Sequence, residues 1–310
     1  MARYLIVRFF GFILVIVTVS FITFFLMYST PGGPFDETQM PLSPAAKANI
    51  RAKYGLDQPF YVQWAKYMGA ALQGDFGESF QFKGYKVSDL FLKYWRNSIL
   101  LGVLAVAWSF PTGILLGILA ALRRNTIVDY VVTAISLSSS TMPQFALVFF
   151  SLAIFSVWLK WLPYGGWVDR GGDVKTLILP VFIFGLGTVG VLARYIRSGM
   201  LDVLGQDYIR TARAKGVPRS WVIGKHAMRN MLIPIVTIFF PVLTNAITGS
   251  IFVELGFVIP GIGRFFIDSI NYRDYPVIMA TVLITATILA FTYLLTDIAY
   301  TVLDPRVRIT

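Results

Sequence analysis

The sequence contains no cysteine and a single histidine, His226. Without cysteine the chain cannot form a disulfide, a thiolate nucleophile or a Cys-ligated zinc site. His226 has no second imidazole or thiol with which to share a metal, so a structural or interface role is favoured for it. The serines near His226 lie in a basic loop without a carboxylate placed to orient the imidazole. We therefore expect no catalytic residue and no metal site on this chain.

Charged residues are also scarce. They make up 14% of the 310 residues, whereas an ordinary soluble domain carries about 25%. Hydrophobic residues make up 56%, and several apolar runs exceed the roughly 18 residues that mark a membrane span. The composition predicts an all-α membrane protein.

Six runs contain no Asp, Glu, Lys, Arg or His, and each is long enough to cross a hydrocarbon core about 30 Å thick as a helix. They are Phe9 to Phe35, Asn97 to Leu122, Tyr130 to Leu159, Thr176 to Ala193, Asn230 to Val253 and Tyr275 to Thr296. We expect the prolines inside these runs to interrupt helices. These are Pro111, Pro143, Pro180, Pro234 and Pro241.

The first run follows Arg3 and Arg8, as the apolar part of a signal peptide would. It is too long for a signal peptide and has no clear small-residue cleavage site, so we expect a retained first span; cleavage is the alternative.

Basic residues indicate the orientation. With a cytoplasmic N-terminus, the inside segments include eight basic residues from Arg194 to Arg229, whereas acids nearly balance the bases of the two short outside loops. This asymmetry favours N- and C-termini in the cytoplasm. The net charge of +11 follows from the same bias and does not require nucleic acid as a partner.

The segment between the first two spans is long and patterned. Ser43 and Gly55 are helix start and stop signals, and the stretch "PFYVQWAKYMGAAL" has helical spacing. We expect three parts in the chain: a first transmembrane helix (1–30), a small helical extracytoplasmic insertion (31–97) and a five-helix core (98–310) with a cytoplasmic loop (201–230). An ordered loop without a binding role is the alternative for the insertion.

Of two nucleotide-binding motifs considered, one is matched only by its letters and the other is absent from the sequence. The string "GLGTVG", Gly185 to Gly190, matches a dinucleotide fingerprint but lies within an apolar span, where close packing of helices is favoured. The sequence contains no GxxxxGK[ST], so ATP-driven transport would need another polypeptide to bind the nucleotide.

The most polar patch inside the spans is "SSSTMPQ", Ser138 to Gln144. We consider two roles for it: lining a translocation path, or hydroxyl bonding across packed helices. The candidate path residues are Ser138, Ser139, Ser140, Thr141, Gln144 and, at the outer end of the fifth span, Glu254. No acid lies near the middle of a span, which argues against a proton- or sodium-coupled carrier.

The most basic stretch is "QDYIRTARAKGVPRSWVIGKHAMRN", Gln206 to Asn230. Gly216 is placed to end a helix and Pro218 to begin another. We expect two short helices joined by a tight turn. The membrane on both sides and the short basic stripe favour docking to a cytosolic protein over nucleic-acid binding.

The same stretch resembles the cytoplasmic EAA loop of ABC-importer membrane subunits. Arg210, Thr211 and Ala212 align with the EAA triplet and Gly216 with its glycine, whereas His226, Met228 and Arg229 depart from the general pattern. Those departures, with "PGGPF", "GDFGESF", "VELGFVIPGIGRFFIDSINYRDYPV" and "DPRVR", resemble the dipeptide/oligopeptide/nickel permease family, and within it the B-type subunits of oligopeptide permeases.

The resemblance implies a type I ABC importer (MetI-like) fold with six transmembrane helices in the bacterial inner membrane. It implies three kinds of protein partner besides membrane lipid: a second, similar permease subunit, one or two cytoplasmic ATPase subunits, and an extracytoplasmic peptide-binding protein. It implies no cofactor on this chain, with ATP and Mg²⁺ on the ATPases. The docking (coupling) helix would comprise Asp207, Tyr208, Ile209, Arg210, Thr211, Ala212, Arg213, Ala214, Lys215 and Gly216.

Peptide import is thus the expected function. The alternatives are a secondary transporter or channel working alone, a membrane receptor or scaffold without transport, and, for the cargo, a nickel chelate or another peptide-like solute.

Overall fold

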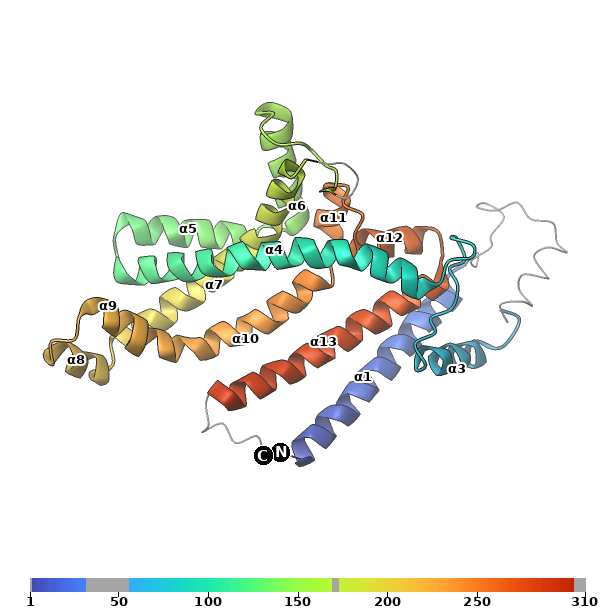
Figure 1. Ribbon diagram of the computed structural model, residues 1–310, viewed down its shortest axis with the longest axis horizontal. Coiled ribbons are helices and arrows are strands. Elements are labelled where there is room, and N and C mark those ends of the chain that lie inside the picture. Colours follow the sequence, from blue (N-terminus) through green and yellow to red (C-terminus); the bar gives the residue numbers. More distant parts are fainter. Residues whose placement is uncertain (1, 32–55, 169–172, 304–310) are drawn as a thin grey trace. The chain divides into compact units, whose positions relative to one another are not determined.

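The computed structural model describes residues 2–31, 56–168 and 173–303, and within these its regular elements are helices (Figure 1). A lone antiparallel bridge joins Glu78 to Lys86. In chain order the helices are α1 (Ala2–Ser29), α3 (Phe60–Ala71), α4 (Val87–Leu122), α5 (Ile127–Thr141), α6 (Gln144–Ser151), η1 (Leu152–Trp158), α7 (Lys175–Leu204), α8 (Asp207–Ala214), α9 (Arg219–Trp221), η3 (Val222–Ala227), α10 (Met228–Ile247), α11 (Ile251–Gly256), α12 (Ile262–Asn271) and α13 (Tyr275–Leu303).

Five segments of the described chain are long and apolar enough to span a membrane. They are Ile6–Ser29, Val87–Leu122, Lys175–Leu204, Ile235–Gly256 and Tyr275–Ala299. A sixth is a bent pair, Ile127–Thr141 with Gln144–Trp158. The predicted all-α, multi-pass membrane fold is confirmed.

The third predicted span is not one straight helix. The chain bends by 108° between its two halves, and Met142 between them is extended, with φ −69° and ψ 132°. Pro143 causes this, because its ring disfavours a helical conformation of the preceding residue. The prediction that the other prolines interrupt helices was wrong: Pro111 lies inside the continuous helix α4, Pro180 inside α7, and Pro234 and Pro241 inside α10. Transmembrane helices accommodate such residues because proline keeps a helical φ and neighbouring groups satisfy the freed carbonyl.

The described residues form two compact units. The first comprises Met1–Asn97 and Pro260–Ala290. Its core joins Phe91 of α4, Phe265 of α12 and Val277 of α13, and a second cluster joins Phe24 of α1 to Met279 of α13. Asp274, 1% exposed, accepts hydrogen bonds from the Ser79 hydroxyl and from the backbone N–H groups of Phe80 and Gln81, and so ties the loop before α4 to the start of α13.

Helix α3 confirms the helical pattern that begins at Pro59. The predicted helix from Ser43 to Gly55 lies outside the described residues, and the extracytoplasmic placement of this segment stays a prediction. The predicted domains follow the chain, whereas the first unit combines α1, α3 and the first turns of α4 with residues from 260 to 290.

The second unit comprises Ser98–Ile259 and Phe291–Thr310, and its helices approach closely at glycines. A Cβ on Gly185 would lie 2.8 Å from the carbonyl oxygen of Ala105 in α4, and one on Gly190 would lie 2.5 Å from that of Ser136 in α5. The string "GLGTVG" lies inside α7, which confirms that it packs helices together and does not begin a dinucleotide site.

Candidate functional site

The basic loop folds as a helix, a tight turn and a second helix, as predicted. Helix α8 has Asp207 in its first turn and Arg213 in its last, which complements the helix dipole at both ends. The turn follows at Gly216, whose φ of +75° is a left-handed conformation that glycine adopts without strain. Pro218 then precedes α9. Figure 1 shows α8 and α9 at the ends of α7 and α10.

Helix α8 has a buried and an exposed face. Ile209 is fully buried and Ala212 is 8% exposed; both pack in one cluster with Val222, against Val203, Leu204 and Val217. The other eight residues of the predicted docking set are exposed: Asp207, Tyr208, Arg210, Thr211, Arg213, Ala214, Lys215 and Gly216. Ile209 and Ala212 therefore hold the helix on its own chain, and the eight exposed residues form the surface that a partner can reach. We call these eight residues the docking face.

The docking face is positively charged. It carries Arg210, Arg213 and Lys215 against one acid, Asp207. The Arg210 guanidinium lies 3.6 Å from the Asp207 carboxylate, with both side chains largely exposed, and such an exposed pair leaves both groups free to meet a partner's charges. A protein with an acidic groove would complement this face.

Two polar contacts of the second unit, one at the basic loop and one between α5 and α7, were not predicted from the sequence. In the first, the Asn230 side-chain amide donates to the Tyr208 hydroxyl over 2.5 Å, which joins α8 to the first turn of α10. The only sequence signal is that both residues belong to the same basic stretch.

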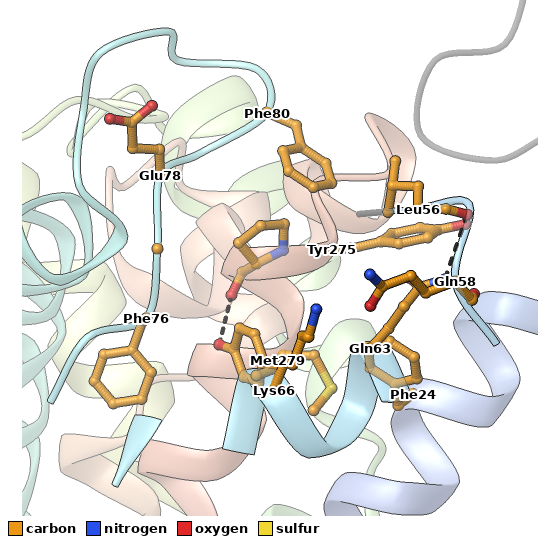
Figure 2. A pocket seen from close by; sticks show the side chains of 13 residues that line it. Phe24, Leu56, Gln58, Gln63, Lys66, Phe76, Glu78, Phe80, Tyr275 and Met279 are labelled. Atoms are coloured by element: carbon orange, nitrogen blue, oxygen red, sulfur yellow. Dashed lines mark hydrogen bonds between the residues drawn. The ribbon is translucent and has the colours of Figure 1, made fainter. Parts of the chain in front are cut away.

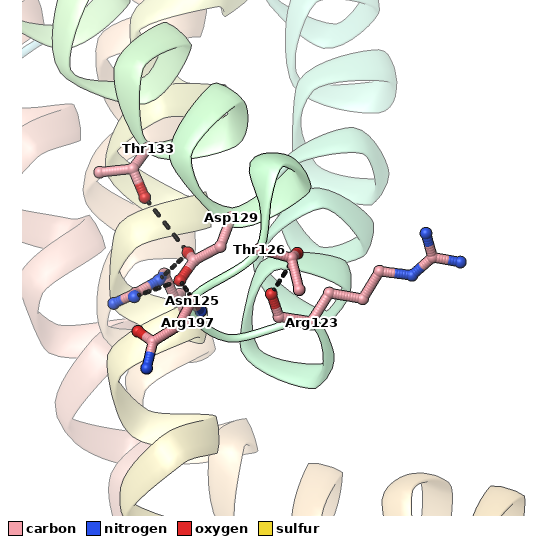
Figure 3. Close-up of polar contacts among 6 residues, drawn as sticks. All are labelled: Arg123, Asn125, Thr126, Asp129, Thr133 and Arg197. Atoms are coloured by element: carbon pink, nitrogen blue, oxygen red, sulfur yellow. Dashed lines mark hydrogen bonds and ion pairs between the residues drawn. The ribbon is translucent and has the colours of Figure 1, made fainter.

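The second missed contact joins α5 to α7 (Figure 3). Arg197 donates through Nε and Nη2 to the two carboxylate oxygens of Asp129, over 2.5 and 2.7 Å. The Asn125 N–H also donates to Asp129, over 3.0 Å. The Asp129 side chain is 2% exposed and that of Arg197 29%. A two-point pair of this kind fixes the relative orientation of the two helices. In the sequence, Arg197 is distinguished only as one of the basic residues of an inside segment.

The polar patch does not form one cluster with Glu254. The hydroxyls of Ser139 and Ser140 donate to the Ser136 carbonyl, and that of Thr141 to the Leu137 carbonyl. These bonds run along α5 and not across to another helix. Ser138 and Thr141 are exposed, Ser139 is buried, and Ser140 and Gln144 are partly buried.

The remaining two candidate path residues make contacts beyond α5. Gln144 accepts a hydrogen bond from the Ser250 hydroxyl over 2.8 Å, and the fully buried Glu254 accepts one from the Ser98 hydroxyl over 2.7 Å. Each contact joins two segments of the second unit, and a translocation role for these residues stays a prediction.

Within the described ranges, no three His, Cys, Asp or Glu residues come together as a metal site would require. The side chain of His226 lies outside the described part of the chain.

Comparison with known proteins decides the family. The model of the family described as "Binding-protein-dependent transport system inner membrane component" matches residues 113–309, and the model of the corresponding N-terminal region matches residues 1–84. The chain belongs to this family of transport-system membrane components.

Its curated relatives in the family are named as peptide permeases. The chain is 38% identical over 309 residues to the dipeptide transport system permease protein DppB of Bacillus subtilis, covering 100% of this chain and 99% of that protein. It is 38% identical over 315 residues to the oligopeptide transport system permease protein AppB of the same organism, covering 99% and 100%. It is 35% identical over 294 residues to the oligopeptide transport system permease protein OppB of Escherichia coli K12, covering 95% and 94%. The predicted family is confirmed.

A solved structure supports the fold. A chain of the inward-facing MetNI methionine ABC transporter matches with a TM-score of 0.54 and 18% identity, covering 69% of this chain and 96% of that one. The predicted MetI-like, type I importer fold is thus confirmed for this family member.

Proposed function

We propose that this permease-family chain is the membrane subunit of an ATP-driven importer that carries peptides into the cytoplasm across a bacterial inner membrane. The observation that carries the proposal is the 38% identity to a dipeptide permease over essentially the full length of both chains. The chain itself performs no catalysis. The ATP and Mg²⁺ belong to the ATPase partners, and an extracytoplasmic peptide-binding protein delivers the cargo.

The docking face is the proposed site of force transfer. Its excess of positive charge suits an acidic groove on a cytoplasmic ATPase, and its buried counterpart, Ile209 with Ala212, makes α8 move together with the ends of α7 and η3. Closure of two ATPase subunits on ATP would then displace this region and open the spans alternately to the two sides, as rigid-body switching does elsewhere.

The remaining assignments follow from the same proposal. Both termini lie in the cytoplasm, a second permease subunit completes the passage, and the polar residues Ser138 to Thr141 and Gln144 contribute to its lining. The Glu254 carboxylate lies in the same unit and supports the packing of α11 on α4 through Ser98.

Reconstitution tests the proposal. The chain is placed in proteoliposomes with the second permease subunit and the ATPases, and labelled di- and oligopeptides are supplied with the binding protein on one side and ATP on the other. We expect peptide accumulation that stops without ATP. Liposomes containing this chain alone should show no flux; cation-driven peptide flux in them would contradict the proposal and favour a secondary transporter. Accumulation of a nickel chelate in place of peptides would refute the proposal that peptides are the cargo.

Charge reversal tests the docking face separately. Arg210→Glu with Arg213→Glu should abolish co-purification of the ATPases. Arg123→Glu with Arg124→Glu makes the same charge change on another exposed loop of the same unit and should leave co-purification intact. Equal loss in both double variants would indicate a general charge effect and refute a docking role for α8.

A further inference from the structure

The first unit contains a cavity of about 280 Å³, separate from the docking face. It lies among the end of α1, the turn before α3, α3 itself, the loop before α4 and the start of α13. This volume is close to the lower end of the range for ligand pockets, about 300 Å³, and suits one or two large side chains.

Most of the cavity wall is apolar or aromatic. Phe24, Phe76, Phe80, Tyr275 and Met279 contribute to it, and Phe80 and Tyr275 lie near each other, with ring centroids 6.5 Å apart. Such a wall favours an apolar or aromatic group, because burying that group releases water from both surfaces.

Hydrogen bonds give the cavity a fixed frame. The Tyr67 hydroxyl donates to the Pro276 carbonyl over 3.2 Å, and burial raises the pKa of Tyr67 well above its ordinary value of 10.0, so this donor keeps its proton. The side-chain amide of Gln63 donates to the backbone carbonyl oxygen of Gln58 over 2.7 Å and fixes the turn before α3. The site is therefore built before any ligand arrives.

Two polar groups that line this frame have no partner in the described structure: the ammonium of Lys66, an exposed residue at the mouth of the cavity, and the buried Oε1 atom of Gln58. Figure 2 shows the Lys66 and Gln58 side chains directed towards the middle of the cavity, whereas Glu78 lies at its far rim. No ion pair joins Lys66 to Glu78 or to another described acid. The Gln58 Oε1 atom is buried and accepts no hydrogen bond, which is unfavourable until a donor reaches it.

We propose that this cavity binds the C-terminal end of a short peptide with an apolar last side chain. The side chain occupies the aromatic wall, the terminal carboxylate pairs with the Lys66 ammonium, and a peptide N–H donates to Gln58 Oε1. Each of the three groups in the cavity then has a complement in the ligand. The inference deepens the proposed function, on which it rests, by giving the permease a contact of its own with the cargo.

A lipid matches the cavity less well than a peptide does. A fatty acid or an anionic phospholipid supplies an apolar chain and a negative charge for Lys66, but offers no amide N–H for the buried acceptor of Gln58. The peptide end supplies all three.

Photo-crosslinking of the whole importer in nanodiscs tests the inference. The probe is a tripeptide whose last residue is benzoylphenylalanine, used as the free acid and as the C-terminal amide. We expect the free acid to label residues of the cavity wall, with Met279 and Phe80 as the sites mapped by mass spectrometry, and the amide to label them at least fivefold less. Lys66→Met should reduce labelling by the free acid to the level of the amide, and Gln58→Leu should reduce it as well.

Lys83→Met is the matched control, since Lys83 is an exposed lysine of the same unit that does not line the cavity; its labelling should equal that of the unchanged protein. Equal labelling by acid and amide, or labelling that ignores Lys66→Met, would overturn the inference. So would phosphatidylglycerol that abolishes labelling and is itself retained by the unchanged protein and lost in Lys66→Met, because the cavity would then be a lipid site.

Peptide uptake by the same preparations separates the two proposals. ATP-driven uptake without labelling of the cavity refutes the peptide site alone. Labelling of the cavity without ATP-driven uptake by the complete importer refutes the proposed transport and leaves the binding site in place.

Discussion

Neighbouring residues of α8 have different surroundings: one packs on its own chain and the next is open to a partner. Ile209 is fully buried against its own chain, whereas the side chain of Arg210, next to it, is 76% exposed. A substitution at the first position changes how the helix is held, and a substitution at the second changes what a partner meets. The two effects are separable by experiment even though both would reduce transport.

Ile209→Ala should loosen α8 from the loop. Truncating a fully buried isoleucine costs about 2–5 kcal/mol, and the cost falls on a short element held by one small cluster. We expect faster hydrogen exchange of the amides from 207 to 217 in the purified protein, together with weaker ATPase binding. Arg210→Ala is the control: exchange should stay as in the unchanged protein. Unchanged exchange in Ile209→Ala would show that the cluster does not hold the helix.

The Asp129–Arg197 pair allows a second residue-scale test. Removing one member leaves the other charge without its partner at a mostly buried position, which costs about 3 kcal/mol, the lower end of the range for such pairs, because Arg197 is partly exposed. Asp129→Leu and Arg197→Met should each lower the thermal unfolding midpoint in detergent. The double variant should recover most of the loss, since apolar side chains of similar size replace both charges. A double variant as unstable as the sum of the single ones would contradict this account.

At the scale of elements, packing of small residues sets how α4, α5 and α7 meet. The sequence allowed part of this to be predicted: "GLGTVG" inside an apolar run indicated close helix packing. It did not indicate that Gly185 contacts α4 while Gly190 contacts α5, because the rotation of each helix depends on its neighbours. The glycines of this motif therefore differ in which neighbouring helix excludes a side chain at their position.

Gly190→Ala and Gly187→Ala form a matched pair that tests this difference. At residue 190 a methyl group would lie 2.3 Å from the Ser139 hydroxyl and 2.5 Å from the Ser136 carbonyl oxygen, whereas at residue 187 its nearest neighbour is 3.7 Å away. We expect Gly190→Ala to be destabilised by about 1–3 kcal/mol through overpacking and Gly187→Ala to unfold at the midpoint of the unchanged protein. Equal stability of the two variants would mean that α5 and α7 can move apart to make room for the methyl group without losing stability.

Proline shows the limit of sequence reasoning at this scale. Pro143 and Pro111 both lie in long apolar runs and have the same local chemistry, yet only Pro143 ends a helix. Proline lowers the stability of a helix, but tertiary contacts decide whether the helix continues through the proline. The number of spans, with the bent pair counted as one, followed from the apolar runs, but α4 and α7 extend beyond their runs. The 108° bend depends on packing that the sequence does not display.

At the scale of the whole molecule, the docking face has to communicate with the spans. Local turn chemistry at Gly216 and Pro218 was enough to predict the shape of the loop. Two longer-range contacts were not predictable, because they pair residues far apart in the sequence. Tyr208 with Asn230, 22 residues on, joins the loop to α10, and Asp129 with Arg197, 68 residues on, joins α5 to α7. Such pairs are determined only when the helices pack.

Tyr208→Phe tests whether the first of these contacts transmits force. The substitution keeps the ring and removes the oxygen that accepts from Asn230. A hydrogen bond of this kind contributes about 1 kcal/mol, which corresponds to about fivefold in an equilibrium constant. In the reconstituted importer we expect the ATPases to remain bound and to hydrolyse ATP, while peptide uptake per ATP hydrolysed falls about fivefold. Tyr195→Phe, at an exposed tyrosine of α7, should leave that ratio unchanged. If uptake and hydrolysis fell together in Tyr208→Phe, the hydroxyl would act in docking. If neither changed, force would leave α8 through the apolar cluster of Ile209, which contacts the end of α7 and η3.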